Sequence, residues 1–263
     1  MAFLDEMVPA MDPAALMQRA GLDPPEAWQR DMFGSAADRL ALLCARQTGK
    51  STATAVAVLQ FALSKAGAIV LVVSPSKAQS DLLFAKIVSI YDALPGQKIG
   101  ARKVAGRLTL ANGSQIISLP GNEKTIRGLS ADLIVFDEAA QVSDELFHTA
   151  MPMVIARRGR VIALSTPFGK RGFFYRACTQ SKGRWELIKI TAEQSARISP
   201  DDLATARREY DPHWFRQEFM CEFQGDVTLY FDLELVDAAF DSNVEPFSES
   251  VATNPFEEML RNV

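Results

Sequence analysis

The sequence predicts an α/β fold with a mainly parallel central sheet flanked by helices, plus a short helical and acidic C-terminal extension. Two observations support this prediction. Short, continuously apolar runs alternate with segments of helical periodicity, which is typical of a parallel sheet covered on both faces. The chain has 263 residues, 48% hydrophobic and 23% charged, and a soluble domain of this size buries a sizeable core.

The first half of the predicted domain contains two strands, each followed by a helix. Residues 39–45 form a continuous apolar run that predicts a buried strand, and residues 68–74 predict a second one. A helix is expected from Gly49 to Lys65 and another from Lys77 to Leu94, where Pro95-Gly96 ends it. These elements form the start of a strand–helix–strand alternation.

The second half continues the pattern with a hairpin, two strands and one helix. Residues 107–119 alternate in polarity around Asn112-Gly113, a strong hairpin signal. Residues 132–137 and 160–165 are further apolar strands, with a helix between them near Asp144 to Ala156. Ligands of such sheets bind beyond the carboxyl ends of the strands, so we expect the functional residues at these ends.

The chain divides into three expected parts: an N-terminal helical segment at 1–24, a central domain at 25–221 and an acidic segment at 222–263. Residues 200–220 have a helical pattern. The segment also contains Tyr210. The aromatic side chains of Trp214, Phe215 and Phe219 would share one face there, and we expect these three in the core.

Charge is distributed unevenly along the chain, although the net charge is only -4. Residues 222–263 hold ten acidic residues and one basic residue, Arg261, which leaves 27 basic and 22 acidic residues in 1–221, a net charge of +5. A mildly basic body suits an anionic partner such as DNA, but an ordinary solvated surface explains the charge equally well.

The cysteines, histidines and apolar runs argue against a cysteine-bound metal site, a secreted protein and a membrane protein. Cys44, Cys178 and Cys221 lack metal-ligand spacing and read as reduced thiols in or near the core. His148 and His213 are isolated, so we expect structural roles for them. No apolar run reaches the roughly 18 residues of a membrane span, and the acidic N-terminus is unlike a secretory signal. We expect a cytoplasmic protein without a membrane partner.

A phosphate-binding loop is predicted at residues 44–51, between the first strand and the first helix. Such a loop needs inward-pointing backbone N–H groups at a helix N-terminus, a lysine for phosphate charge and a hydroxyl for Mg²⁺. Gly49, Lys50 and Ser51 supply the end of that pattern, whereas Cys44 replaces its usual first glycine. We therefore expect a P-loop NTPase. Its nucleotide-binding residues are Arg46, Gln47, Thr48, Gly49, Lys50, Ser51 and Thr52.

Two further polar groups follow apolar strands. Asp137 and Glu138 end the strand at 132–137, where Asp137 would support Mg²⁺ and Glu138 would polarise the attacking water. Ser165, Thr166 and Pro167 end the next strand, where small hydroxyl residues can sense the γ-phosphate. Taken alone, the first pair could be a helix cap and the second group a proline turn.

Together these residues resemble one family, the large subunits of phage terminases, over about 25–224. The family has a variant phosphate loop, Arg-Gln-x-Gly-Lys-Ser, matched by 46–51, and a strand that ends Asp-Glu-Ala, matched by 137–139. Ser165-Thr166-Pro167, with the glycines and aromatics at 169–175, resembles its coupling motif. The absence of the first glycine is usual in this family.

The resemblance implies roles for two more residues. Gln29, in Ala27-Trp28-Gln29-Arg30, would read the adenine base, although a helix cap or a solvent-facing position is also open. Arg127 would act on a neighbouring subunit's nucleotide, although a phosphate contact in cis or a plain surface position is also open. Arg46 would either contact phosphate or brace the loop.

The function that this resemblance implies is ATP hydrolysis with Mg²⁺, coupled to the movement of double-stranded DNA into a procapsid in the host cell cytoplasm. The implied partners are double-stranded DNA, the portal protein, the small terminase subunit and further copies of the chain in a ring. A helicase-like translocase and an inert DNA- or protein-binding module with the motor fold are the alternatives.

Large terminases also have a nuclease domain that uses a metal-binding carboxylate cluster. Here Asp232, Asp237 and Asp241 are present, but no strand framework follows that could gather them around two metal ions. We therefore expect no nuclease activity in this chain, and 222–263 is read as an acidic linker or the truncated start of a nuclease domain.

Overall fold

The computed structural model describes residues 12–95, 101–104, 106–120, 129–180 and 183–225. The chain separates into two compact units, Met1–Gln224 and Gly225–Val263. Every helix and strand discussed below belongs to the first unit. Arg127 and the acidic segment beyond Gly225 lie outside the described residues, so the predictions made for them stay predictions.

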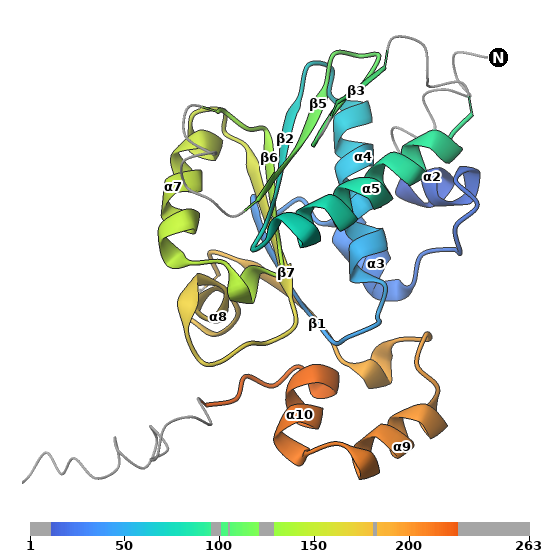
Figure 1. Cartoon of the computed structure of the whole chain (residues 1–263), viewed down its shortest axis with the longest axis vertical. Helices are drawn as coiled ribbons and strands as arrows, with labels where there is room; N and C mark the ends of the chain where they lie inside the picture. Colours follow the sequence, from blue (N-terminus) through green and yellow to red (C-terminus); the bar gives the residue numbers. More distant parts are fainter. Residues whose placement is uncertain (1–11, 96–100, 105, 121–128, 181–182, 226–263) are drawn as a thin grey trace, which may run out of the picture. The chain divides into compact units, whose positions relative to one another are not determined.

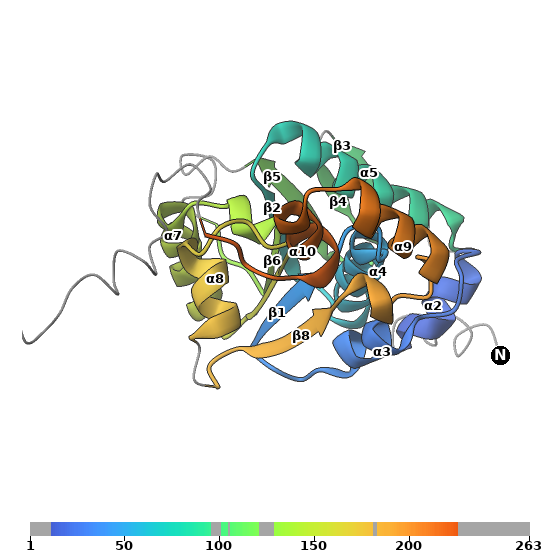
Figure 2. The same cartoon turned by 90° about the horizontal axis from the view of Figure 1, so that it is seen from below.

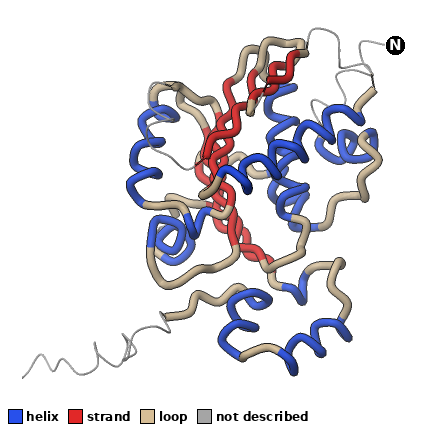
Figure 3. The backbone as a smooth tube through the Cα atoms, in the orientation of Figure 1, coloured by secondary structure: helices blue, strands red, loops and turns tan. Residues whose placement is uncertain are grey.

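The elements follow one another in the alternation that the sequence predicts (Figures 1 and 3). The strands are β1 (Arg39–Cys44), β2 (Ile69–Ser74), β3 (Arg102–Val104), β4 (Arg107–Thr109), β5 (Gln115–Pro120), β6 (Leu133–Asp137), β7 (Arg160–Ser165) and β8 (Glu186–Ile190). The α-helices are α2 (Pro13–Arg19), α3 (Ala27–Gly34), α4 (Lys50–Ser64), α5 (Lys77–Ala93), α7 (Asp144–Ile155), α8 (Gly172–Thr179), α9 (Pro200–Glu209) and α10 (Pro212–Met220). Two short 3₁₀ helices, η1 (Ala139–Gln141) and η2 (Ala192–Gln194), follow β6 and β8.

The strands form one mainly parallel sheet, as predicted. Within the described residues its order is β3-β4-β5-β2-β6-β7-β1-β8. The pairs from β5 to β8 in this order are parallel. At the other edge the β3–β4 and β4–β5 pairs are antiparallel, so β4 runs opposite to the other described strands. The predicted hairpin is the β4–β5 pair, in which Leu108 lies opposite Ile116. Because β6, β7 and β1 are neighbours, the three predicted motifs emerge at the same edge of the sheet.

Helices cover both faces of the sheet (Figures 1 and 2). On one face, Leu40, Leu42 and Cys44 of β1 join the core that α3, α4 and α5 complete. On the other, Ala41 and Leu43 join the core formed with α7 and α8. This alternation explains why the strands are continuously apolar, since both of their faces are buried. Helix α2 packs into the first core through Leu16 and Met17.

Polar caps start several helices where the sequence indicated a break. The hydroxyl of Ser76 accepts the N–H of Gln79 at the start of α5, and Ser143 caps α7 through Leu146 in the same way. These caps satisfy N–H groups that the first turn leaves without partners. The strand ends and helix starts around the predicted motifs are therefore determined locally.

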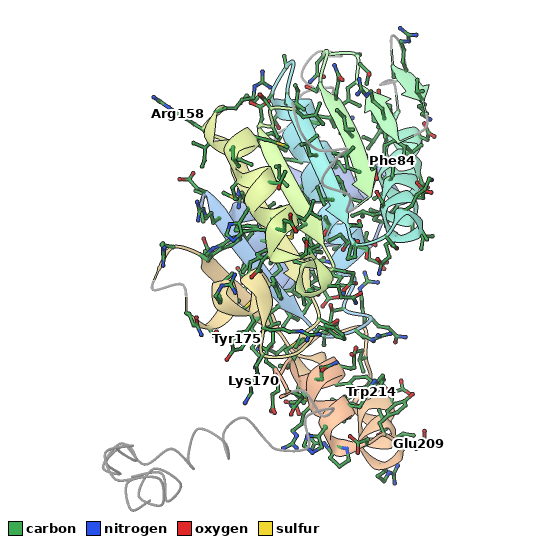
Figure 4. All side chains as sticks on the ribbon, turned by 60° about the vertical axis from the view of Figure 1, so that its left-hand side comes forward. Phe84, Arg158, Lys170, Tyr175, Glu209 and Trp214 are labelled. Atoms are coloured by element: carbon green, nitrogen blue, oxygen red, sulfur yellow. The ribbon has the colours of Figure 1, made fainter. Side chains whose placement is uncertain are left out.

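The segment at 200–220 differs from the prediction. It forms two helices, α9 and α10, because Asp211 caps the second and Pro212 occupies its first position. Phe215 is buried, as expected for the core, but Trp214 is 38% exposed and Tyr210 46% exposed. Figure 4 labels Trp214 on this segment. The expectation that Trp214 is a core residue was wrong: its ring lies tilted against Tyr210 and edge-on to Phe219 near the surface.

Strands β3 and β8 and helix α8 were not predicted. Strand β8 is mostly exposed because it is an edge strand, paired only with β1 among the described residues. Cys44 and Cys221 are buried and Cys178 is half-buried, which agrees with the prediction of core or near-core thiols. Burial raises the pKa of Cys178 and Cys221 to about 12, so these thiols stay protonated at neutral pH. Within the described part of the chain, no helix has the length and apolar character that crossing a membrane requires.

Candidate functional site

The loop between β1 and α4 has the backbone of a phosphate-binding loop. Gln47 and Gly49 have positive φ angles of 62° and 83°, which turn the chain sharply before the first turn of α4. The hydroxyl of the buried Thr48 donates to the carbonyl oxygen of Ala45 at 3.0 Å and holds the turn closed. The N-terminus of a helix with free N–H groups follows immediately, as an anion site requires.

Lys50 and Glu138 meet across the carboxyl edge of the sheet. Lys50 Nζ lies 2.6 Å from Glu138 Oε1, and the two side chains are 13% and 20% exposed. Lys50 begins α4 after β1, whereas Glu138 follows β6, two strands away in the sheet order. The structure thus brings together the predicted phosphate-binding lysine and the predicted water-activating glutamate.

Glu138 has an unusual backbone conformation that directs its side chain. Its φ of 49° and ψ of 46° lie in the left-handed region, which a non-glycine residue occupies at an energetic cost. Ser165 Oγ lies at the end of β7 and donates to Glu138 Oε2 at 3.3 Å. The carboxylate is therefore held by Lys50 on one oxygen and by Ser165 on the other.

Asp137 occupies the last position of β6 and is 6% exposed. Burial, followed by the charge of Glu138, raises its pKa from 3.8 to about 6, although Lys50 opposes the increase. Its Oδ1 atom is buried and has no hydrogen-bond partner among the described residues. A buried oxygen acceptor without a partner at this edge fits a place reserved for a cation.

Asp137 and Ser51, the residues predicted to support Mg²⁺, offer the oxygen ligands that this ion prefers. Mg²⁺ prefers hard oxygen ligands and usually takes only one or two from the protein, with waters and phosphate oxygens completing the shell. The unpartnered Asp137 Oδ1 meets this requirement, and Ser51 lies in the first turn of α4, next to Lys50. No cluster of three or more His, Cys, Asp or Glu side chains that could hold a metal ion occurs among the described residues.

The predicted coupling residues continue from β7 into the site. Ser165 is 1% exposed and Thr166 is 8% exposed, and Pro167 after them is also buried. Ser165 contacts the predicted catalytic residue Glu138 through a hydrogen bond. The strand end of β7 thus lies beside Glu138, because β7 and β6 are paired as far as Asp137 and Leu164.

Arg46 links the phosphate loop to helix α10. Its Nε donates to the carboxylate of Glu218, and its backbone N–H donates to the carbonyl oxygen of Glu218 at 3.0 Å. Glu218 is 4% exposed, whereas the Arg46 side chain is 60% exposed. In this conformation Arg46 braces the loop, which was one of the two roles left open for it.

Gln29 lies on α3 and is fully buried. Its Oε1 accepts the backbone N–H of Glu26 at 2.9 Å, which caps the helix. Its Nε2 has no partner among the described residues, and the same holds for Nε1 of the neighbouring Trp28. The cap was one of the alternatives for Gln29, while the unpaired nitrogen is a free donor of the kind that base recognition needs.

Three residues near the site were not predicted. Lys86 of α5 donates to Thr52 Oγ1 at 3.2 Å, and its charge weakly opposes the rise that burial causes in the pKa of Asp137. Glu218 holds Arg46, and Arg197 lies against Gly49. Only Glu218 carried a sequence signal, an acidic residue inside an aromatic helical segment. The other two reach the site through tertiary structure, which spacing along the chain does not reveal.

Comparison with known proteins identifies related sequences. Residues 41–236 match the sequence model of the N-terminal part of the terminase large subunit, T4likevirus-type. The terminase large subunit of Escherichia phage T5 is 27% identical over 170 residues, which are 62% of this chain and 39% of that protein. The chain spans less than half the length of the curated relatives that it matches.

Solved structures with the same fold are also found. The large terminase ATPase domain of Thermus phage P74-26 superimposes with a TM-score of 0.69 at 19% identity, covering 79% of this chain and 97% of that one. The large terminase of the thermophilic bacteriophage D6E, solved in complex with ADP, has a TM-score of 0.65 at 12% identity, with coverage of 76% and 54%. At these identities the likeness shows a common fold.

Proposed function

Because the chain belongs to the terminase large-subunit family, we propose that it is an ATP-hydrolysing motor that moves double-stranded DNA into a procapsid. One observation carries the proposal: Lys50 and Glu138 meet at 2.6 Å at the carboxyl edge of the sheet, beside the buried Asp137. Phosphoryl transfer to water requires three groups: a cation that binds phosphate, a carboxylate that activates water and a carboxylate that holds a metal ion.

The proposed reaction uses these groups in order. Gly49 and the first turn of α4 bind the phosphates of ATP, and Lys50 neutralises their charge. Asp137 and Ser51 would hold Mg²⁺, which supplies further neutralisation of phosphate charge when bound. Glu138 accepts a proton from the attacking water, whose oxygen bonds to the γ-phosphorus as ADP leaves.

The contacts of Glu138 support a mechanism in which its carboxylate is released to accept a proton only when ATP is bound. Glu138 is paired with Lys50, so the lysine must turn towards phosphate before the glutamate can accept a proton from water. Ser165 keeps a hydrogen bond to the other carboxylate oxygen and can retain the orientation of Glu138 during that exchange. A solved relative of the same fold, the large terminase of phage D6E, is described as a complex with ADP.

The partners follow from the proposed function. A packaging motor of this family would act on double-stranded DNA together with the portal protein, a small terminase subunit and further copies of itself in a ring. The net charge of +5 over residues 1–221 is compatible with contact to DNA. Arg127 would serve the nucleotide of a neighbouring copy.

Phosphate release from ATP, measured by malachite green with and without double-stranded DNA, tests the proposal. We expect Mg²⁺-dependent release that Lys50→Ala abolishes while the far-ultraviolet circular dichroism stays unchanged. Lys189→Ala, an exposed lysine of β8, is the matched control and should keep turnover. ATP binding without any turnover in the wild type would favour an inert module, and full turnover in a folded Lys50→Ala variant would contradict the phosphate-loop assignment.

A further inference from the structure

The side chain of Arg197 lies directly on the phosphate loop. A Cβ atom placed on Gly49 would be 2.9 Å from Arg197 Nε and 3.3 Å from its Cζ, so the guanidinium is in contact with this glycine. Arg197 comes from the segment between η2 and α9, which follows the last strand of the sheet (Figure 2). The contact therefore joins the nucleotide loop to a part of the chain that the proposed function leaves without a role.

One edge of this guanidinium is occupied by carboxylates from the segment around the start of α3. Arg197 Nε donates to Glu26 Oε1 at 3.1 Å, and its Nη2 lies 3.8 Å from Asp23 Oδ2. The Arg197 side chain is 37% exposed, whereas that of Glu26 is 16% exposed. The positive charge is thus largely balanced, while part of the side chain stays open to solvent.

The same glutamate fixes the backbone that carries Arg197. Glu26 Oε2 accepts the N–H of Ala196 at 3.3 Å and the hydroxyl of the buried Ser195 at 3.4 Å. Ser195 Oγ in turn accepts the N–H of Arg197 at 3.3 Å. Backbone and side chain of Arg197 are therefore oriented by one carboxylate, which restricts the plane of the guanidinium.

Glu26 also contacts the residue with the unpaired donor. Its N–H is bonded to Gln29 Oε1 at 2.9 Å, and Gln29 Nε2 is fully buried without a partner among the described residues. The start of α3 thus joins an oriented guanidinium to an amide nitrogen that lacks an acceptor. Amide donors and planar cations are the groups that recognise heterocyclic bases, by hydrogen bonding and by stacking respectively.

We propose that Arg197 is a base-binding residue whose guanidinium plane stacks on the purine of the bound nucleotide, with Glu26 as its positioning residue. The inference rests on the proposed function, because it assumes that phosphates lie on the loop at 44–51. Lys50 and Glu138 mark the end of the site where the terminal phosphate reacts. The proposal places the adenosine end on the Gly49 side of the loop, where Arg197 lies.

Stacking by Arg197 would affect only ligands that contain a base, whereas a charge contact would affect any ligand that contains the phosphates. A guanidinium already paired with Glu26 and close to Asp23 has little charge to offer a phosphate, whereas its side chain is 37% exposed and could contact an aromatic ring. Inorganic tripolyphosphate contains the phosphate chain without base or ribose. Loss of stacking should therefore weaken the binding of ADP and leave the binding of tripolyphosphate unaffected.

Isothermal titration of the whole chain with ADP and with tripolyphosphate, both with Mg²⁺, tests the proposal. We expect Arg197→Ala to lower the affinity for ADP about 10-fold, as for a lost stacking partner. Its affinity for tripolyphosphate should stay within about 2-fold of the wild type. Arg197→Lys keeps a charge but not a plane, so it should behave like Arg197→Ala. Glu26→Gln should weaken ADP to a smaller extent and also spare tripolyphosphate.

The control variant is Arg208→Ala, which removes an exposed arginine of α9 that donates to Thr205 Oγ1, and it should bind both ligands normally. Unchanged tripolyphosphate affinity also shows that each variant has a folded phosphate loop. Equal weakening of both ligands, rescue by lysine, or no weakening of ADP would overturn the stacking role. A wild-type chain that binds neither ligand would instead overturn the proposed function.

Discussion

Glu138 illustrates at the residue scale how one side chain serves two partners. It is four-fifths buried, its carboxylate is paired with Lys50 at 2.6 Å and accepts a hydrogen bond from Ser165 at 3.3 Å, and its backbone is left-handed. Removing the charge of either member of a partly buried pair leaves the other uncompensated, which is costly. An isosteric amide keeps the shape and one acceptor oxygen, so Glu138→Gln disturbs the surroundings least while it removes the carboxylate.

Glu138→Gln should retain ATP binding and lose turnover. The amide keeps the shape and can still accept from Ser165, but it cannot take a proton from water, so we expect the rate to fall by about 10²–10⁴. Phosphate release and nucleotide titration on the same preparation check this. Glu145→Gln, an exposed position on α7, is the matched control. Turnover within about 2-fold of the wild type would mean that another base acts.

Asp137 should make the chain less stable as the pH rises. Burial raises its pKa to about 6, so it stays protonated in the folded chain while it ionises in the unfolded chain near its ordinary value of 3.8. The free energy of unfolding should therefore fall between about pH 4 and pH 6 and then level off.

Asp137→Asn removes this titration while keeping the size and an acceptor oxygen. We expect the variant to be more stable than the wild type at pH 7.5 by about 1–3 kcal/mol, with little difference below pH 4. Urea unfolding across this pH range, in the presence of EDTA, measures the difference. A wild type that is the more stable chain at pH 7.5 would show that the ionised carboxylate is better accommodated than its burial suggests.

At the scale of elements, helix α10 is bound to the phosphate loop by Arg46 and Glu218. The buried carboxylate of Glu218 accepts from Arg46 Nε, and Gln217 Nε2 donates to its other oxygen at 3.0 Å. A backbone hydrogen bond of 3.0 Å between Arg46 N and Glu218 O reinforces the contact. The loop and the helix should therefore be coupled in stability.

Arg46→Ala should destabilise the chain more than Glu218→Gln, because it leaves a buried carboxylate without its cation. We expect a loss of about 1–3 kcal/mol for Arg46→Ala, reduced from a fully buried pair because the arginine is largely exposed. The double variant should recover part of this loss. Urea unfolding of the four chains gives the coupling energy, and simple additivity of the two losses would contradict the coupling.

The elements show where sequence reasoning succeeded and where it could not. Strands β1, β2, β6 and β7 are buried on both faces, so their continuous apolar runs were visible without any tertiary information. Strand β8 lies at the edge with exposed side chains, and its pattern is too weak to recognise. The break between α9 and α10 depends on Asp211 and Pro212, a cap and a proline whose signal was overridden by the surrounding helical pattern.

The candidate site shows the same division. The residues of the phosphate loop, Asp137, Glu138 and Ser165 were predicted because each follows a recognisable strand, and parallel strands bring their carboxyl ends together. Arg197 and Lys86 reach the site from the segment after η2 and from α5, through contacts with Gly49 and Thr52. Their positions depend on how separate elements pack, which no local pattern contains.

At the scale of the whole molecule, we expect turnover to depend on assembly. In the proposed ring, Arg127 would stabilise charge on the γ-phosphate of a neighbouring subunit, and such arginines contribute about 10³–10⁵ in rate in well-studied NTPases. Specific activity should therefore rise with protein concentration or on addition of DNA.

Mixing Arg127→Ala subunits with Glu138→Gln subunits tests this directly. Each should be nearly inactive alone, but a Glu138→Gln subunit can lend its arginine to an Arg127→Ala subunit with an intact glutamate. Partial recovery of phosphate release in the mixture is the expected result. If co-assembled mixtures recover nothing, Arg127 does not act in trans.

The position of β1 in the sheet order has a consequence for how the chain reaches its native state. Its register partners are Val161 and Ile162 of β7 on one side and Glu186 and Leu187 of β8 on the other, all more than 100 positions further along the chain. Contacts of such sequence separation form slowly, because a long loop must close first. During synthesis on the ribosome, β1 lacks its strand partners in the described sheet until β7 and β8 have emerged. The nucleotide site should therefore be among the last parts of the domain to mature, although its sequence is among the first to be translated.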